Sequence, residues 1–378
     1  MLYYNITLVY KWMSIMLSRI AWILASWLIF CNVTQAQIHL TDVEGRQVTL
    51  AAPAKRAYIG FYYEDFLAVN GPESFQQVVA FSKSDWTLRS SQWLRYQSAL
   101  PRLAQLVDVG SLYNQSFDFE RLLTTRPDLL ILAKWQLEGF ANYLPMLQRL
   151  NIPYIVVDFN QGTEAKLASI RLMGQVMGHA ERAERLADEY RQSLKDTQRR
   201  ISKAQLPPPI AYIELGDKGP NEYSSSYGGS IWGPLLQLAG ADNIAVGVVD
   251  NPSPLSADYV LTKKPDVIFL VGGDWKNMPN AVQMGYGAQA APIQERLTQY
   301  ALRAGWPQLP AVKNQRIYAL YHGGARTVYD FIFIQYLAKS LYPSAFVDVD
   351  PQHNLAQFYH QYLPIEAEGI FYQRWQGE

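Results

Sequence analysis

Short apolar runs alternate with segments of helical periodicity along the first half of the chain. Four of these runs are clear and a fifth is weaker: residues 57–61, 78–81, 129–133 and 154–157, with 106–109 as the weaker one. Buried strands that alternate with helices are typical of βαβ units, in which neighbouring strands run parallel. The pattern therefore predicts a parallel sheet within residues 37–160.

A charged helical pattern then occupies the middle of the chain. It runs from Thr163 to Lys203, with a break near Gly178, and holds good helix formers without Gly or Pro after that break. Three prolines at 207–209 end it, because proline cannot continue a helix. Residues 161–206 are thus expected to form a helical linker.

The second half, residues 207–378, repeats the alternation of the first half. Strands are expected at 210–215, 267–271 and 317–320, and helices at 231–239, at 332–341 and near the C-terminus. Together the patterns predict an α/β protein with two lobes joined by a long helix.

One sequence unit occurs once in each half. FERLLTTRPDLLILAKW begins at residue 119 and ADYVLTKKPDVIFLVGGDW begins at residue 257, and an ungapped alignment pairs Glu120 with Asp258. Asp118 and Ser256 are placed to cap a short helix, which the shared Pro-Asp ends before a buried strand. Two lobes built on this unit would bind a ligand where the carboxyl ends of their strands meet.

Residues 1–36 are typical of an export signal. Lys11 and Arg19 precede an apolar stretch at 20–30, and small residues at 34 and 36 suit a cleavage site. The stretch is shorter than the roughly 20 residues that span a bilayer, although a retained membrane anchor stays an alternative. We predict a periplasmic protein. Cys31, the one cysteine, would be removed with the signal, which leaves no disulfide.

The composition narrows the function classes. The formal net charge is +0, which argues against a nucleic-acid partner and against a polybasic membrane patch. The 25 Tyr and 10 Trp supply apolar area with polar edges, as large cores or a ligand cleft require.

Several stretches resemble the class III substrate-binding proteins of ABC importers, which deliver ferric siderophores, haem, cobalamin and related metal complexes. They are the export signal, LTDVEGRQVTLAAPAKRAYIGF from residue 40, the two Pro-Asp strands, LLQLAGADNIA and WPQLPAVKNQRIYAL. The resemblance covers the chain from about residue 38 onward. It implies two Rossmann-like lobes with parallel sheets, joined by a single long backbone helix, and an ABC permease dimer as partner.

The resemblance also gives the repeated acids a role. In the family, an acid on each lobe contacts arginines of the permease, and the matching positions here are Glu120 and Asp258. Asp258 is shorter than the glutamate usual in the family. The residues alone leave a second interpretation open, because acids in the first turn of a helix are stabilised by the helix dipole.

Loops that leave the predicted strands at their carboxyl ends supply the candidate ligand contacts. Aromatic rings suit the flat apolar face of a chelate, and arginine suits its anionic oxygens. The candidates are Tyr62, Tyr63, Trp86, Arg89, Trp135, Tyr223, Tyr227, Trp275, His322 and Arg326. Gly323 and Gly324 suggest a close backbone approach in the last loop. The predicted ligand is a metal chelate such as a ferric siderophore.

A dedicated metal cage has little support in the sequence. Only His322 of the five histidines falls in a candidate loop, and His353 and His360 lie seven residues apart on the predicted C-terminal helix. Whether a metal is bound directly is left open. Naked ferric iron on tyrosine oxygens with His322, haem, cobalamin and an oxyanion such as molybdate remain alternatives.

Enzymes and sensors are the rival classes. The chain has no Gly-x-Ser-x-Gly, His-Glu-x-x-His, Walker or Gly-x-Gly-x-x-Gly motif, so we expect a monomeric binding protein without catalysis or cofactor. A hydrolase that uses Glu214 with Asp274 stays an alternative, as does a periplasmic sensor.

Overall fold

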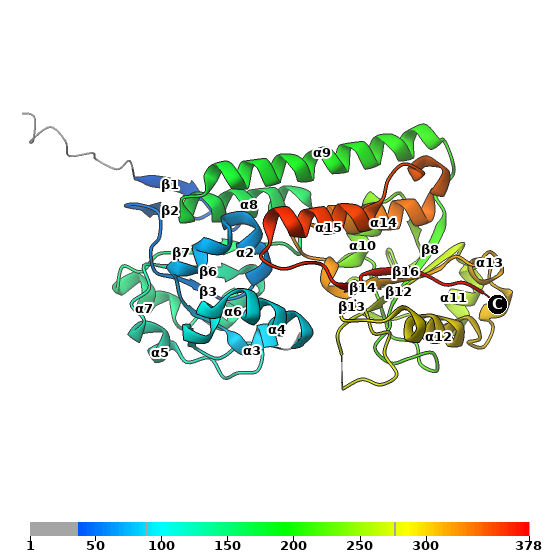
Figure 1. Cartoon of the computed structure of the whole chain (residues 1–378), viewed down its shortest axis with the longest axis horizontal. Coiled ribbons are helices and arrows are strands. Elements are labelled where there is room, and N and C mark those ends of the chain that lie inside the picture. The colour runs from blue at the N-terminus through cyan, green and yellow to red at the C-terminus, as the bar shows by residue number, and fades with distance from the viewer. Residues whose placement is uncertain (1–36, 88–89, 276, 378) are drawn as a thin grey trace, which may run out of the picture.

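The computed structural model describes residues 37–377 except 88, 89 and 276, so the predicted export signal lies outside the described residues. Two lobes lie side by side, each built on a five-stranded sheet, and helix α9 (Ala180–Ala204) runs along one side of both (Figure 1). The predicted α/β fold is confirmed. Within the described part of the chain, no helix is both long and apolar enough to cross a bilayer.

The N-terminal lobe has the predicted parallel sheet. Its strand order is β5-β4-β3-β6-β7, and each neighbouring pair runs parallel. The strands are β3 (Ala57–Ile59), β4 (Val78–Phe81), β5 (Val107–Asp108), β6 (Leu129–Ala133) and β7 (Tyr154–Val157). All five residues of β6 are buried, which explains its continuous apolar run. An antiparallel hairpin of β1 (Ile38–Thr41) and β2 (Gln47–Leu50) precedes the sheet.

The C-terminal lobe differs from the prediction at both edges of its sheet, where short strands that were not predicted are added. Its strand order is β10-β8-β12-β14-β16, and the last strand runs antiparallel to β14. The strands are β8 (Ile210–Leu215), β10 (Asp242–Asn243), β12 (Val267–Gly272), β14 (Ile317–Tyr321) and β16 (Tyr372–Arg374). No apolar run marks β16, because this three-residue edge strand is only partly buried.

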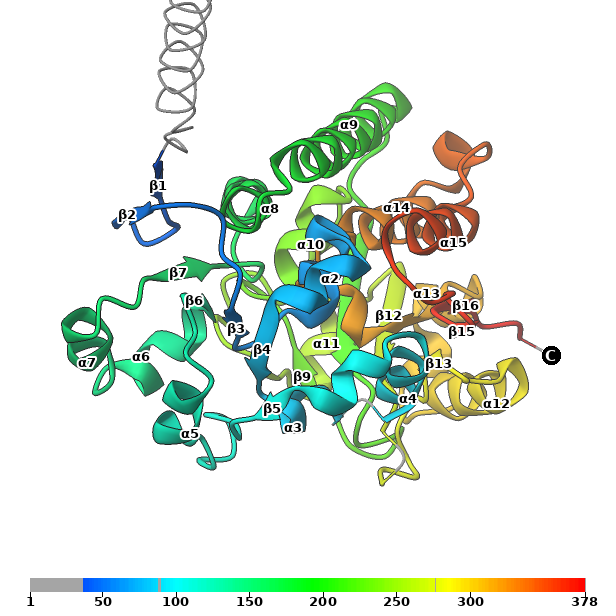
Figure 2. The ribbon, with the colours of Figure 1, turned by 60° about the vertical axis from the view of Figure 1, so that its left-hand side comes forward.

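Helices cover both faces of the two sheets. Besides α9, the helices are α2 (Tyr63–Asn70), α3 (Lys83–Thr87), α4 (Ser90–Ala99), α5 (Phe119–Thr124), α6 (Leu137–Phe140), α7 (Leu144–Arg149), α8 (Thr163–Met177), α10 (Trp232–Leu238), α11 (Ala257–Lys263), α12 (Ala290–Ala301), α13 (Pro310–Lys313), α14 (Asp330–Leu341) and α15 (Pro351–Tyr362). Helices α8, α9, α14 and α15 lie on the same side of the molecule (Figure 2).

The break in the helical linker falls where the sequence predicts it. Helix α8 ends at Met177, and Gly178 takes a φ of +84° as the left-handed cap that glycine accommodates without strain. A buried ion pair then ties this linker to the C-terminal lobe. Lys166 of α8 pairs with Asp330 at the start of α14, and the Tyr190 hydroxyl donates to Asp330 at 2.7 Å.

The sequence repeat corresponds to one structural unit in each lobe. The Asp118 side chain accepts the Arg121 N–H, and the Ser256 side chain accepts the Tyr259 N–H, so both predicted helix caps are confirmed. The repeated aspartate has a further role that the sequence did not reveal. Its carboxylate accepts a backbone N–H at the start of the neighbouring strand: Arg56 donates to Asp128 at 2.9 Å, and Ile210 donates to Asp266 at 3.0 Å.

Candidate ligand-binding site

The first wall of the site is formed where β3 ends and α2 begins. Tyr62 caps α2 with φ 57° and ψ 45°, a left-handed conformation that is uncommon for a bulky residue and is often retained at functional sites. Gly60 permits the turn, because a Cβ at this position would lie 2.3 Å from Oε1 of Gln136. The sequence thus places the Tyr62 ring at the carboxyl end of the sheet.

The opposite wall comes from the loop after β14. Arg326 also takes a left-handed conformation, with φ 64°. Its approach depends on two glycines: a Cβ at Gly323 would lie 2.4 Å from the Tyr321 ring, and one at Gly324 would lie 2.2 Å from the Phe333 ring. The two glycines therefore allow this loop to pack closely against the Tyr321 and Phe333 rings.

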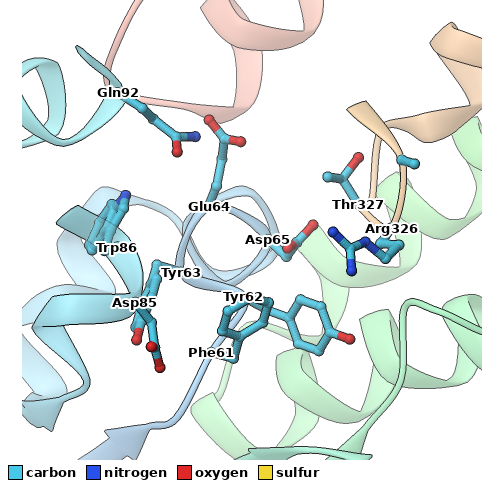
Figure 3. Close-up of a pocket in the computed structure, with 11 residues that line it drawn as sticks. Phe61, Tyr62, Tyr63, Glu64, Asp65, Asp85, Trp86, Gln92, Arg326 and Thr327 are labelled. Atoms are coloured by element: carbon cyan, nitrogen blue, oxygen red, sulfur yellow. The ribbon is translucent and has the colours of Figure 1, made fainter. Parts of the chain in front are cut away.

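These two walls enclose a pocket between the lobes (Figure 3). The pocket has a volume of about 40 Å³, enough for a few water molecules or for one polar group of a larger ligand. Its lining combines rings with charged and polar groups: Phe61, Tyr62, Tyr63, Glu64, Asp65, Asp85, Trp86, Gln92, Ala325, Arg326 and Thr327. They come from the loop after β3, from α2, α3 and α4, and from the loop after β14, so the pocket lies at the carboxyl ends of strands from both lobes.

Arg326 acts on tyrosines of both lobes. Burial raises the pKa of Tyr62 above its usual value, while the Arg326 guanidinium acts in the opposite direction. The pKa of Tyr227 is raised by burial and opposed by Arg326 in the same way. Both phenols are therefore neutral at physiological pH. The Tyr62 side chain is 5% exposed, so its hydroxyl lies in the buried lining of the pocket.

Candidate aromatic side chains contact one another within each lobe. In the N-terminal lobe, the Phe61 ring makes edge contacts with Tyr62 at 5.0 Å and with Trp135 at 5.3 Å between centroids. In the C-terminal lobe, the His322 ring lies 6.1 Å from the rings of both Tyr227 and Trp275. Trp135 is 38% exposed, so this side of the site presents a ring to solvent.

A hydrogen bond from Trp232 determines which ring nitrogen of His322 carries the proton. Trp232 Nε1–H, which can only donate, lies 3.0 Å from His322 Nδ1. Nδ1 is therefore the acceptor, and the proton of the neutral ring belongs on Nε2. Since a neutral imidazole binds a metal through its unprotonated nitrogen, this arrangement argues against His322 as a metal ligand. The described residues also contain no cluster of three or more His, Cys, Asp or Glu side chains placed to hold a metal ion.

Four of the ten predicted ligand residues line the pocket: Tyr62, Tyr63, Trp86 and Arg326. The rings of Tyr63 and Trp86 stack at 4.7 Å, and the Tyr63 hydroxyl donates to the Ser82 carbonyl at 2.6 Å. These two residues therefore shape the pocket floor from the core. Trp135, Tyr227, Trp275 and His322 do not line the pocket, and Arg89 lies outside the described residues.

Tyr223 lies apart from the pocket lining, in a cluster within the C-terminal lobe. Its ring packs 4.3 Å from the Arg303 guanidinium, and its hydroxyl accepts Trp306 Nε1–H at 2.8 Å. Arg303 also binds Glu214, because its two terminal guanidinium nitrogens donate to the carboxylate oxygens at 2.6 and 2.9 Å. Tyr223, a predicted ligand residue, and Glu214, a suggested hydrolase residue, therefore belong to one packed cluster around Arg303.

Asp274, the partner suggested for Glu214 in a hydrolase, has a contact of its own. Its carboxylate accepts the Ser91 N–H from the other lobe at 2.7 Å. Glu214 is fully buried, so the two carboxylates face different surroundings. The structure therefore offers no support for the pair as a general acid and base.

Sequence reasoning missed the polar half of the pocket. Glu64, Asp65, Asp85, Gln92 and Thr327 line it, yet none is among the ten predicted ligand residues. Glu64 and Asp65 are acids in the first turn of α2, which was the available signal. Gln92 shows no such signal, because its place depends on how α4 packs against the other lobe.

The two repeated acids occupy equivalent places. Glu120 lies in the first turn of α5 and Asp258 in the first turn of α11, and both residues are exposed. Each helix directly precedes a parallel strand of its own lobe, β6 after α5 and β12 after α11.

Known proteins place the chain in one family. The family model described as periplasmic binding protein matches residues 59–322. The structure of FepB, a TroA-like periplasmic binding protein from Veillonella parvula, is 30% identical, with a TM-score of 0.84 over 90% of this chain and all of that chain. A vitamin B12-binding protein of Pectobacterium atrosepticum is 24% identical over 208 residues, which is 54% of this chain and 71% of the relative.

A more distant structure shares the fold alone. The molybdate-bound MolA of Haemophilus influenzae is 19% identical, with a TM-score of 0.65 over 88% of this chain and 99% of that chain. The match to the family model spans well over half of the sequence and includes the loops that carry Tyr62 and the start of the His322 loop. The chain therefore belongs to the periplasmic binding protein family, as a class III solute-binding protein of ABC importers.

Proposed function

We propose that this protein captures an iron complex, a ferric siderophore, and delivers it to the permease of an ABC importer. The observation that carries the proposal is the position of Arg326. It shares a pocket with Tyr62 of the other lobe and acts electrostatically on Tyr227 of its own lobe. A guanidinium between aromatic walls suits a ligand that combines anionic oxygens with a flat apolar face.

The donor groups favour a chelate over a bare ion. Burial raises the pKa values of Tyr62 and Tyr227, so both side chains offer neutral hydroxyls where ferric iron would require phenolates. His322 accepts Trp232 Nε1–H through Nδ1, so it lacks a free lone pair at that nitrogen for a metal. Such a site donates hydrogen bonds to ligand oxygens and leaves coordination of the metal to the chelator.

Cobalamin is the second candidate. The curated relatives with significant similarity include vitamin B12-binding proteins of Pectobacterium, at 24% and 25% identity. The exposed Trp135 ring, in edge contact with Phe61, could cover part of a corrin face. This candidate shares the aromatic walls with the first but makes less use of Arg326.

We further propose that Glu120 and Asp258 contact the permease. Both are exposed, one on each lobe, at corresponding positions of the repeated unit. Two equivalent acids suit a partner with two equivalent subunits, and such rim charges mainly steer association. Ligand capture would involve no bond made or broken in the ligand.

Tryptophan fluorescence provides the test. The protein is titrated with ferric catecholate and hydroxamate siderophores, haem, cobalamin, free ferric iron and molybdate. Sub-micromolar quenching by a ferric siderophore supports the proposal. Equally tight binding of cobalamin, with no response to any siderophore, favours the second candidate. Tight binding of free ferric iron or molybdate alone contradicts both.

A further inference from the structure

A buried carboxylate lies at the boundary between the two lobes. Glu64, the second residue of α2, is 6% exposed and accepts hydrogen bonds from four tyrosine hydroxyls. The donors are Tyr96 at 2.6 Å, Tyr286 at 2.9 Å and Tyr359 at 3.1 Å on Oε1, and Tyr329 at 2.6 Å on Oε2. We call these four residues the tyrosine cage.

The cage draws its members from both lobes. Tyr96 belongs to α4 of the N-terminal lobe, whereas Tyr286, Tyr329 and Tyr359 belong to the C-terminal lobe. All four are at most 2% exposed. Their hydroxyl oxygens also lie close to one another, with 2.7 Å between Tyr286 and Tyr359 and 3.1 Å between Tyr329 and Tyr359. Since each hydroxyl carries one proton, it donates either to Glu64 or to a neighbouring tyrosine at any one time. One carboxylate of the N-terminal lobe thus holds three linked donors of the C-terminal lobe.

The next residue of α2 makes a parallel connection. The Asp65 carboxylate accepts the Val328 N–H from the C-terminal lobe at 2.7 Å. Val328 follows Arg326 by two residues, and Tyr62 precedes Glu64 by two residues. The connections between the lobes therefore join the same two segments that carry the pocket walls.

Separating the lobes at this point would be costly. A buried carboxylate is stable only when its oxygens are satisfied, and hydrogen bonds to a charged acceptor are stronger than those between neutral groups. Opening would remove three of the four donors from Glu64 at once. Other contacts also cross this boundary: Asp274 accepts the Ser91 N–H at 2.7 Å, whereas the Arg95–Glu368 pair lies at the surface with a 67% exposed carboxylate and contributes little.

From this geometry we infer that Glu64 is a positioning residue. It locks the two lobes at one spacing in the ligand-free protein, so that Tyr62 and Arg326 face each other before a ligand arrives. Loss of this lock should weaken ligand binding, because Tyr62 and Arg326 would no longer be held opposite each other. The statement about the lobes is independent of the ligand, while the statement about binding rests on the proposed function.

Distance measurements by double electron–electron resonance test the lock. Cys31, the one cysteine of the sequence, is replaced by serine, and spin labels are attached to cysteines at Gln148 on α7 and Glu295 on α12, both exposed and on different lobes. The variants are Glu64→Ala and, in case that protein does not fold, Tyr286→Phe/Tyr329→Phe, which keeps the packed rings. Glu189→Ala is the matched control, because it removes the acceptor of Tyr362 outside this boundary.

We expect one narrow distance in the full-length protein and in Glu189→Ala, with or without ligand. Glu64→Ala and the double Phe variant should show a broader distribution and bind ligand at least tenfold more weakly. A narrow, unchanged distance in both variants would overturn the lock. Two distances in the ligand-free parent protein would overturn it as well. If the distances behave as expected but no ligand of the fluorescence panel binds, the lock stands and the proposed function fails.

Discussion

Tyr62 and Arg326 both adopt left-handed backbone conformations, with φ of 57° and 64°, and they line one pocket from opposite lobes. Such conformations cost of order 1–3 kcal/mol in non-glycine residues and persist where the surrounding structure fixes them. Here that surrounding structure is α2 and the loop before α14, which Asp65 and Glu64 join. The site therefore depends on backbone geometry as much as on side-chain type.

Replacement of Arg326 tests the electrostatic part of the site. We expect Arg326→Ala to weaken binding of an anionic ferric chelate by more than tenfold, because a charge-assisted bidentate contact is lost. Arg326→Lys should give an intermediate affinity, since the charge remains without the planar fork. Calorimetric titration measures both, and unchanged affinity in Arg326→Ala would remove this residue from the site.

Charge reversal tests the proposed contact with the permease. The double variant Glu120→Lys/Asp258→Lys should abolish uptake in cells while ligand affinity stays the same, because neither acid lines the pocket. Glu181→Lys is the matched control, as Glu181 is also an exposed acid in a first helical turn, on α9. Normal uptake by the double variant would show that the permease binds elsewhere.

The repeated aspartates make a prediction about stability. Asp128 accepts two backbone N–H groups, from Lys55 and Arg56, whereas Asp266 accepts one, from Ile210. Asp128→Ala should lower the free energy of unfolding by about 1–3 kcal/mol, and Asp266→Ala by less, given the strength of hydrogen bonds to charged acceptors. Urea unfolding measures both. Equal stability of Asp128→Ala and the parent protein would show that these bonds are not needed to hold the strand.

The ion pair between Lys166 and Asp330 is expected to respond differently from a surface pair. Asp330→Ala leaves Lys166 buried without its counter-ion and should cost about 3–5 kcal/mol. Lys166→Met/Asp330→Leu should recover much of this loss, because no unpaired charge remains. Glu184→Ala, which breaks the exposed Arg171 pair, should cost about 1 kcal/mol or less. Thermal unfolding measures the stability of these variants. Equal losses of stability in Asp330→Ala and Glu184→Ala would contradict the account.

The sequence predicts the parts of this protein that depend on neighbours along the chain. The apolar runs mark β4, β6, β7 and β8 with their observed bounds, and Gly178 marks the break between the two linker helices. The helix caps at Asp118 and Ser256 follow from the local sequence as well.

Contacts between distant residues could not be predicted in this way. Glu64 lies 222 residues from Tyr286, 265 from Tyr329 and 295 from Tyr359. Nothing in the local pattern distinguishes these tyrosines from Tyr223, which packs on Arg303 within one lobe. The loop residues could be ranked only by the strand they follow, so a candidate such as Tyr223 could not be separated from Tyr62.

Anomalous diffraction from crystals grown with a ferric siderophore tests the central claim most directly, because it locates the iron itself. We expect one iron peak between the lobes, next to Arg326 and flanked by Tyr62 and Tyr227, with the siderophore oxygens as its ligands. An iron peak coordinated by His322 or by tyrosine oxygens of the protein, or one located away from this pocket, would contradict the account.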